Sequence, residues 1–404
     1  GLARRLAARP DVARIEANPR LRMPAPPPEE PGGPWVIAES PEAIEPNLTQ
    51  VGAPDVWALG YTGLGVVVGG QDTGVQWDHP ALQAHYRGWN GSTASHDYNW
   101  HDAIHDGDGD CGVDAAEPCD DDDHGTHTIG TMVGDDSGTN RIGMAPGAQW
   151  IACRNMQEGV GTPASYTECF EWFVAPTDLD GENPDPERAP HVINNSWSCP
   201  DSEGCDEVET ELLRAVVENT RAAGIVVVVS AGNGGIGGCS TIVDPAAIYD
   251  ASFTIGAVDS SDVPASFSSR GPVTVYDPDL MKPDISAPGV SVRSAIRGDN
   301  YASFSGTSMS APHVAGLVAL LLSADPSLAG DVDAIEATIR STAAHPATST
   351  QVCGGVAATV FPNNTFGAGR IDALAAVESL FAGGLIFRDG LELGGTVRWS
   401  FVEP

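Results

Sequence analysis

Runs of apolar residues that end in glycine and polar residues recur along the central part of the chain. Residues 66–68 are Val-Val-Val and lead into Gly69-Gly70-Gln71-Asp72, and residues 225–229 lead in the same way into Ser-Ala-Gly-Asn. Uninterrupted apolar runs predict strands that are buried on both faces of a parallel sheet. The pattern therefore predicts a doubly wound α/β fold, a mainly parallel sheet flanked by helices.

Polar side chains stand where these predicted strands end. Asp72 follows the first run and Asn233 follows the second, at the carboxyl ends of strands, which is where open α/β sheets carry their chemistry. His124 precedes small and β-branched residues that suit a helix packed tightly against the sheet. The side-chain amide of Asn233 can donate a hydrogen bond toward a developing oxyanion.

Ser308 lies in Gly-Thr-Ser-Met-Ser-Ala-Pro-His (306–313), followed by the small apolar run 314–319. This arrangement indicates a nucleophile at the start of a helix. A serine nucleophile needs a neighbouring base, a group that orients the base, and donors for the oxyanion. Taken singly, such a serine is usually a helix cap and such an aspartate a turn residue. The combination, in this order, favours covalent catalysis.

Four motifs carry a family resemblance: Asp-Thr-Gly (72–74), His-Gly-Thr-His (124–127), Ala-Gly-Asn (231–233) and the Ser308 motif. In this order they resemble the subtilisin family of serine proteases, over roughly residues 46–380. Residues 265–272 and 282–289 are also similar to family patterns, and residues 71–80 resemble the bacillopeptidase F-like branch.

The resemblance implies a role for each residue of the site. Ser308 would be the nucleophile, His124 the base that takes its proton, and Asp72 the carboxylate that holds the imidazolium. Asn233 and the backbone N–H of Ser308 would form the oxyanion hole. His79, His127 and His313 lie inside the same motifs and are expected to be structural.

The resemblance also implies a peptide-binding edge strand, residues 195–198. A peptide would add to it as a further strand, with side-chain pockets adding selectivity. Trp197 is open to two interpretations, a wall of a substrate pocket or an ordinary packed aromatic residue. The predicted substrate-binding residues are Ser196, Trp197, Ser198, Ala231 and Gly232.

Composition excludes several partners. The chain has 404 residues, 55 acidic against 20 basic, and a formal net charge of -35. Such a charge argues against nucleic acid and against anionic membrane surfaces, and no apolar run is long enough to span a membrane. An acidic surface that keeps a secreted enzyme soluble and acidic clusters that bind calcium both remain open as explanations.

Eight cysteines, an even number, indicate an oxidising compartment. The sequence contains no Cys-x-x-Cys pair and no His-Glu-x-x-His motif, so it lacks the residue spacing of a zinc site or of a metalloprotease. Two pairs are close enough in sequence for local bridges, a third joins a strand to the following helix, and the fourth remains by elimination. The expected pairs are Cys111–Cys119, Cys199–Cys205, Cys153–Cys169 and Cys239–Cys353.

An acidic insertion precedes His124. Asp106, Asp108 and Asp110 alternate with glycines, as at the start of an EF-hand loop, although the later glycine and distant glutamate are not in register. A calcium site and a solvated acidic loop are both consistent with this pattern. Ala81 stands where many family members place a calcium-ligating aspartate.

The expected organisation has three parts. Residues 1–34 would be the end of an inhibitory propeptide and a Pro-rich junction, 35–381 the catalytic domain, and 382–404 a C-terminal tail that resembles tails of secreted bacterial proteins. Since the chain begins at Gly1 and has no signal-peptide core, we expect a trimmed segment of a secreted, bacterial precursor.

The predicted function is that of a secreted serine endopeptidase, and its expected partners are protein or peptide substrates and its own inhibitory propeptide. The predicted chemistry needs no cofactor, and Ca²⁺ is a possible structural ion. Because His124 must be neutral to act, activity should rise through the imidazole range, about pH 6.5. A protease dedicated to one partner and a catalytically silent binding module are the alternatives.

Overall fold

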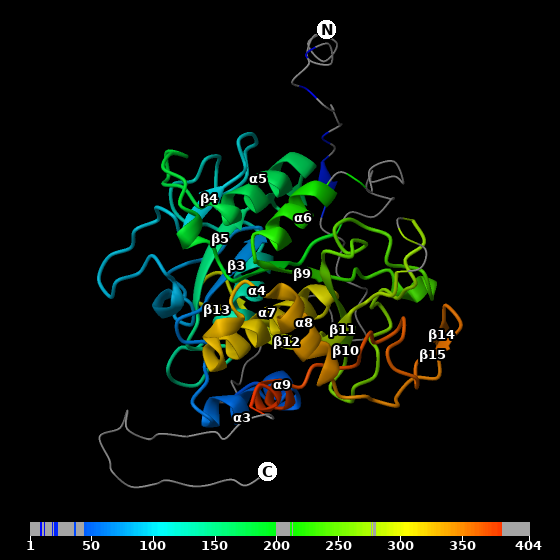
Figure 1. The fold of residues 1–404 in the computed structure, drawn as a ribbon. Helices are drawn as coiled ribbons and strands as arrows, with labels where there is room; N and C mark the ends of the chain where they lie inside the picture. Colours follow the sequence, from blue (N-terminus) through cyan, green and yellow to red (C-terminus); the bar gives the residue numbers. More distant parts are fainter. Residues whose placement is uncertain are drawn as a thin grey trace, which may run out of the picture.

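The apolar runs form the parallel sheet that the sequence predicts. The computed structural model describes residues 9, 12, 18, 20–22, 36–37, 44–198, 211, 213–275, 277 and 280–381. Seven strands pair in the order β11-β10-β9-β8-β3-β5-β4, and every neighbouring pair is parallel (Figure 1). The strands are β3 (Val67–Asp72), β4 (Trp100–Asp102), β5 (Gln149–Arg154), β8 (Val192–Asn195), β9 (Val226–Ser230), β10 (Phe253–Val258) and β11 (Ile285–Pro288).

Helices cover both faces of this sheet (Figure 1). Alternate residues of β9 show the division: Val226 and Val228 belong to one apolar cluster, and Val227 and Val229 to the other. The first cluster packs against α2 (Pro46–Gln50), α3 (Ala53–Ala58), α4 (His124–Val133), α7 (Thr307–Ala324), α8 (Val332–Ser341) and α9 (Ala373–Ser379); the second packs against α5 (Pro163–Val174) and α6 (Arg214–Ala222). The doubly wound fold class is therefore confirmed.

Two glycines let helices approach the central strand β3 from opposite sides. A Cβ atom on Gly69 would lie 2.8 Å from Cε1 of Phe173 in α5, and one on Gly70 would lie 2.7 Å from Cδ1 of Ile129 in α4. Any larger side chain would push a helix away from the sheet. Because β3 lies between β5 and β8, the strand order reverses there, which is where open α/β sheets form their crevice.

Helix α7 runs through the core, with residues 307–322 all buried. Contrary to the sequence expectation, α7 is by length and composition long and apolar enough to cross a membrane, the one such helix among those in the described part of the chain. Since 89% of that stretch is buried inside the fold, α7 is the core helix of the domain.

Smaller elements complete the fold. Three short sheets are antiparallel. They comprise β1 (Leu21–Arg22) with β7 (Val160–Gly161) and β6 (Met156–Gln157), β12 (Val292–Ile296) with β13 (Asn300–Phe304) and β2 (Val36–Ile37), and β14 (Val352–Cys353) with β15 (Val356–Ala357). Single 3-10 turns lie at η1 (Gln83–His85), η2 (Pro186–Arg188), η4 (Gly235–Gly237) and η5 (Pro326–Leu328).

Three of the four expected disulfides are confirmed. Cys111–Cys119, Cys153–Cys169 and Cys239–Cys353 are bonded, and the second joins β5 to α5 as expected. The expected Cys199–Cys205 pair lies outside the described residues, as does the tail 382–404. The domain boundaries at 34 and 381 stay predictions.

Truncating the core helix tests this packing. Leu317 of α7 is fully buried, so Leu317→Ala removes apolar contacts and leaves a cavity, and we expect it to lower the free energy of unfolding by about 2–5 kcal/mol. Leu64→Ala, at a side chain that is 78% exposed, should change it by less than about 0.5 kcal/mol. Chemical denaturation measures both, and equal effects would contradict the buried position of α7.

Candidate active site

Residues from four distant segments meet at the carboxyl ends of β3, β8 and β9. Asp72 is the last residue of β3, His124 is the first of α4, and Ser308 is the second of α7. Asn233 follows β9 by three residues. The side chains that the sequence analysis assigned to catalysis are therefore brought to one edge of the sheet, although they span 236 positions (308 minus 72).

Asp72 and His124 form a buried pair. The Nδ1 atom of His124 lies 2.8 Å from Oδ1 of Asp72, and the two residues are 8% and 3% exposed. Asp72 also accepts from the backbone N–H of Thr73 at 2.8 Å and from the hydroxyl of Thr128 at 3.4 Å. These donors fix the carboxylate, and the carboxylate fixes the imidazole ring with Nε2 on its other side.

The environment makes His124 a stronger base than a free imidazole. Burial by itself lowers the pKa of His124, but the charge of Asp72 and the hydrogen bond to it outweigh burial, with smaller contributions from Asp122 and Asp120. The net pKa of His124 lies above its ordinary value of 6.5. In contrast, burial lowers the pKa of His127 to about 3 and that of His313 to about 4, which keeps both neutral.

Ser308 is held against the end of β8 by a reciprocal pair of hydrogen bonds. Its hydroxyl donates to the carbonyl oxygen of Ser196 at 3.1 Å, and the hydroxyl of Ser196 donates to the carbonyl oxygen of Ser308 at 2.9 Å. The second bond is possible because the carbonyl oxygen of Ser308 has no donor within the helix. Pro312 lies four residues further along α7 and has no N–H to offer that carbonyl.

Asn233 has a fixed amide orientation. Its Oδ1 atom accepts from both the backbone N–H and the hydroxyl of Thr307, each at 3.0 Å. The hydroxyl oxygen of Thr307 in turn accepts from the N–H of Gly232 at 3.1 Å. Since Oδ1 is occupied, Nδ2 remains as the donor of this side chain. Sequence reasoning missed Thr307, although it lies inside the Ser308 motif.

Trp197 is packed into the core. It is 1% exposed, stacks on Tyr166 with ring centroids 3.8 Å apart, and meets Phe170 edge-on at 6.4 Å. Of the two interpretations of Trp197, the structure favours the packed aromatic residue.

The other predicted substrate-binding residues are buried as well, and their role in binding stays a prediction. These are Ser196, Ser198, Ala231 and Gly232.

The acidic insertion has no metal-holding arrangement among the described residues. Asp106, Asp108 and Asp110 are exposed, and no group of three His, Cys, Asp or Glu side chains in the described ranges is placed to hold a metal ion. Asp106 lies 3.8 Å from the guanidinium of Arg20. The calcium interpretation therefore gains no support from the geometry.

Titration of His124 tests the electrostatics of the site. We expect NMR to show a His124 midpoint above about 6.5, the value of a free imidazole. Asp72→Asn should bring it below that value, because burial is then opposed only by the smaller contributions of Asp122 and Asp120. His313 is the internal control and should stay neutral across this range. A wild-type His124 that titrates below a free imidazole would contradict the described pair.

Comparison with known proteins places these residues in a family. Residues 63–369 match the subtilase family. The chain is 43% identical to bacillopeptidase F of Bacillus subtilis (strain 168) over 350 residues, which are 85% of this chain and 22% of that protein. It is 31% identical to subtilisin E of the same strain over 293 residues, 72% of this chain and 64% of that protein.

A third relative, subtilisin DY of Bacillus licheniformis, is 33% identical over 288 residues, 71% of this chain and 87% of that protein. The chain thus spans about a fifth of bacillopeptidase F and just under two thirds of subtilisin E. Because the family match covers most of the chain and contains every residue of the site described above, the chain belongs to the subtilase family, a family of serine endopeptidases.

Proposed function

We propose that this chain is a serine endopeptidase that cleaves peptide bonds through an acyl-enzyme on Ser308. The observation that carries the proposal is the buried Asp72–His124 pair, 2.8 Å between Oδ1 and Nδ1, at the sheet edge where α7 presents Ser308. Membership of the subtilase family supports the same chemistry.

The proposed reaction uses the side chains of Ser308, His124 and Asp72 and a water molecule. Ser308 Oγ leaves its hydrogen bond to Ser196 and attacks the peptide carbonyl carbon, while Nε2 of His124 takes the hydroxyl proton. The C–N bond then breaks as His124 returns that proton to the leaving amine. A water molecule attacks the acyl-enzyme by the same route and releases the acid. Asp72 stays ionised and stabilises the imidazolium throughout.

Two donors would stabilise the oxyanion. One is Nδ2 of Asn233, which has no acceptor among the described residues while Oδ1 accepts the two bonds from Thr307. The second donor is the N–H of Ser308 in the first turn of α7, where backbone N–H groups have no partner within the helix. In a subtilisin, loss of the asparagine donor lowers turnover by about 10²- to 10³-fold, and we expect an effect of the same size from loss of the Asn233 donor.

We propose that an extended peptide binds by strand addition to the β6–β7 hairpin, a different place from residues 195–198, where the sequence analysis expects it. Support comes from the N-terminal segment, because β1 (Leu21–Arg22) pairs antiparallel with β7 (Val160–Gly161). Beside this pairing, the N–H of Ala164 donates to the Asn18 side chain at 2.9 Å. An extended segment on this hairpin is consistent with residues 1–34 being the end of a propeptide.

We further propose that the protein acts outside the cell. The three described disulfides support this, since such bonds persist in oxidising compartments. Bacterial relatives of the subtilisin type are in keeping with a bacterial, secreted enzyme.

For the acidic insertion we propose a solvated loop, because Asp106, Asp108 and Asp110 are all exposed. The alternative, a structural Ca²⁺ ion on these carboxylates, makes a different prediction. With a solvated loop, the double variant Asp106→Asn/Asp108→Asn should show the same change in Tm as the wild type when EDTA and then CaCl2 are added. A calcium-dependent rise in Tm that the double variant loses would establish the ion site.

Covalent labelling tests the proposed function. Exposure to a fluorophosphonate should add one adduct to the wild type and none to Ser308→Ala, because only an activated serine reacts. Intact-mass spectrometry measures the adduct and also shows whether residues 1–34 are still attached. A folded, fully processed wild type that takes no adduct would favour the silent binding module.

A further inference from the structure

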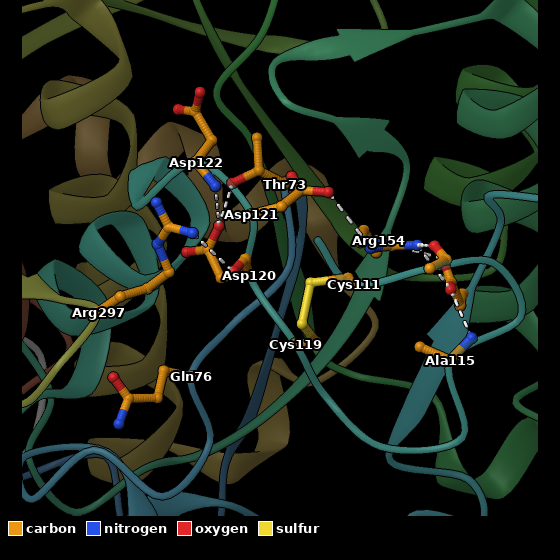
Figure 2. The surroundings of a disulfide bond; sticks show 12 residues. Thr73, Gln76, Cys111, Ala115, Cys119, Asp120, Asp121, Asp122, Arg154 and Arg297 are labelled. Atoms are coloured by element: carbon orange, nitrogen blue, oxygen red, sulfur yellow. Dashed lines mark hydrogen bonds and ion pairs between the residues drawn. A yellow bond between two sulfur atoms is a disulfide. The ribbon is translucent and has the colours of Figure 1, made fainter. Parts of the chain in front are cut away.

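The last part of the acidic insertion differs from the first. Cys119, bonded to Cys111, is followed by Asp120, Asp121, Asp122 and Asp123, and then directly by His124. Figure 2 shows Asp120 directed toward Thr73 on one side of the disulfide and Asp121 directed toward Arg154 on the other. Although Asp106, Asp108 and Asp110 are exposed, Asp120 and Asp121 are buried.

Asp120 joins the helix of His124 to the loop of Asp72. One carboxylate oxygen accepts from the Thr73 hydroxyl at 2.8 Å, and the other accepts from the Thr126 N–H at 2.9 Å and the Thr126 hydroxyl at 2.5 Å. Thr73 also donates its N–H to Asp72 and accepts from the N–H of Gly125. One buried carboxylate thus connects residues that adjoin both partners of the Asp72–His124 pair.

Two glycines allow close contact between three backbone segments, which are the Cys119–Asp120 segment, the Asp72–Gly74 loop and the start of α4. A Cβ atom on Gly74 would lie 1.7 Å from the carbonyl oxygen of Cys119. A Cβ atom on Gly125 would lie 2.0 Å from the carbonyl oxygen of Gly74 and 3.1 Å from Cβ of Asp72. With no space to spare, a shift of the Cys119–Asp120 segment is transmitted directly to Asp72 and to the start of α4.

Asp121 makes a second connection, to the hairpin β6–β7. Its Oδ1 atom accepts from the N–H of Glu158 at 2.8 Å, and its Oδ2 atom lies 3.3 Å from Nη1 of Arg154. Arg154 is fully buried and also donates to both carboxylate oxygens of Asp102, each at 2.9 Å. Glu158 lies in the turn between β6 and β7, so Asp121 anchors the hairpin on which β1 is paired.

We propose that Asp120 and Asp121 are positioning residues with separable effects. Asp120 holds the Asp72–His124 pair in its reactive geometry, and Asp121 holds the β6–β7 hairpin that receives the peptide. The proposal rests on the proposed function, hydrolysis at Ser308. Displacement of reacting groups lowers turnover, whereas displacement of a peptide-binding hairpin weakens substrate binding.

Steady-state hydrolysis of a peptide substrate, measured on the pH plateau, separates the two effects. Asp120→Asn should lower kcat by at least about tenfold and leave KM within about twofold. Asp121→Asn should raise KM by about tenfold, the effect of one hydrogen bond to a charged group, with kcat within about twofold. Glu117→Gln is the matched control, an exposed charge between Cys111 and Cys119, and should change neither constant by more than about twofold.

A second pair of variants decides the question if Asp120→Asn fails to fold. Thr73→Val removes the hydroxyl that bridges Asp120 to Gly125, and Thr73→Ser keeps it. We expect Thr73→Val to have a lower kcat than the wild type and Thr73→Ser to have a kcat close to that of the wild type. Equal kcat values in the two variants would overturn the role of Asp120.

The outcomes distinguish this proposal from the proposed function. An active wild type whose Asp120→Asn variant keeps its kcat, or whose Asp121→Asn variant keeps its KM, overturns the positioning proposal alone. Loss of kcat and rise of KM together, to the same extent in both variants, also overturns it, since the effects would then not be separable. A wild type that neither hydrolyses peptide nor reacts with a fluorophosphonate overturns the proposed function, and this proposal with it.

Discussion

The burial of one carboxylate against one imidazole constrains the rest of this site. Asp72 is 3% exposed and His124 is 8% exposed, and a charge so far from water is tolerated only when it is paired and hydrogen-bonded. Asp72 meets this requirement with donors from His124, Thr73 and Thr128. The helix of His124 must therefore start within hydrogen-bond distance of the end of β3.

Close backbone packing makes that approach possible. Gly70 lets α4 lie on β3, and Gly125 lets the first turn of α4 touch the Asp72–Gly74 loop. On the other flank, Pro312 frees the carbonyl group of Ser308 for the hydroxyl of Ser196, which ties α7 to the end of β8. The short motifs of this chain thus encode contacts between backbones as well as reactive side chains.

The sequence allowed the fold class and two disulfide pairs to be predicted from local signals, which are apolar runs and short cysteine spacings. The third described pair, Cys239–Cys353, joins residues 114 positions apart and was predicted by elimination. The sequence also indicated which side chains would meet, since the carboxyl ends of parallel strands share one edge of the sheet. Their catalytic roles stay predictions. The bonds of Thr307 to Asn233 and of Asp120 to Thr73 join segments far apart in the chain, and no local pattern reports them.

Where the sequence was ambiguous, packing gave the answer. The sequence fits Trp197 as a pocket wall and nearly as well as a core residue, and its stacking on Tyr166 distinguishes the two. The sequence did not show which aspartates of the acidic insertion are buried, but in the structure Asp106, Asp108 and Asp110 are exposed, whereas Asp120 and Asp121 are buried by their tertiary contacts.

The central claim is that peptide bonds are cleaved through an acyl group on Ser308, and trapping that group tests it most directly. The protein would be quenched in acid during hydrolysis of a peptide ester and digested, and the peptide containing Ser308 would be weighed by mass spectrometry. The account predicts that this peptide carries the acyl group of the ester, and that Ser308→Ala carries none and turns over no substrate. Hydrolysis that continues in Ser308→Ala at the wild-type rate would contradict the account.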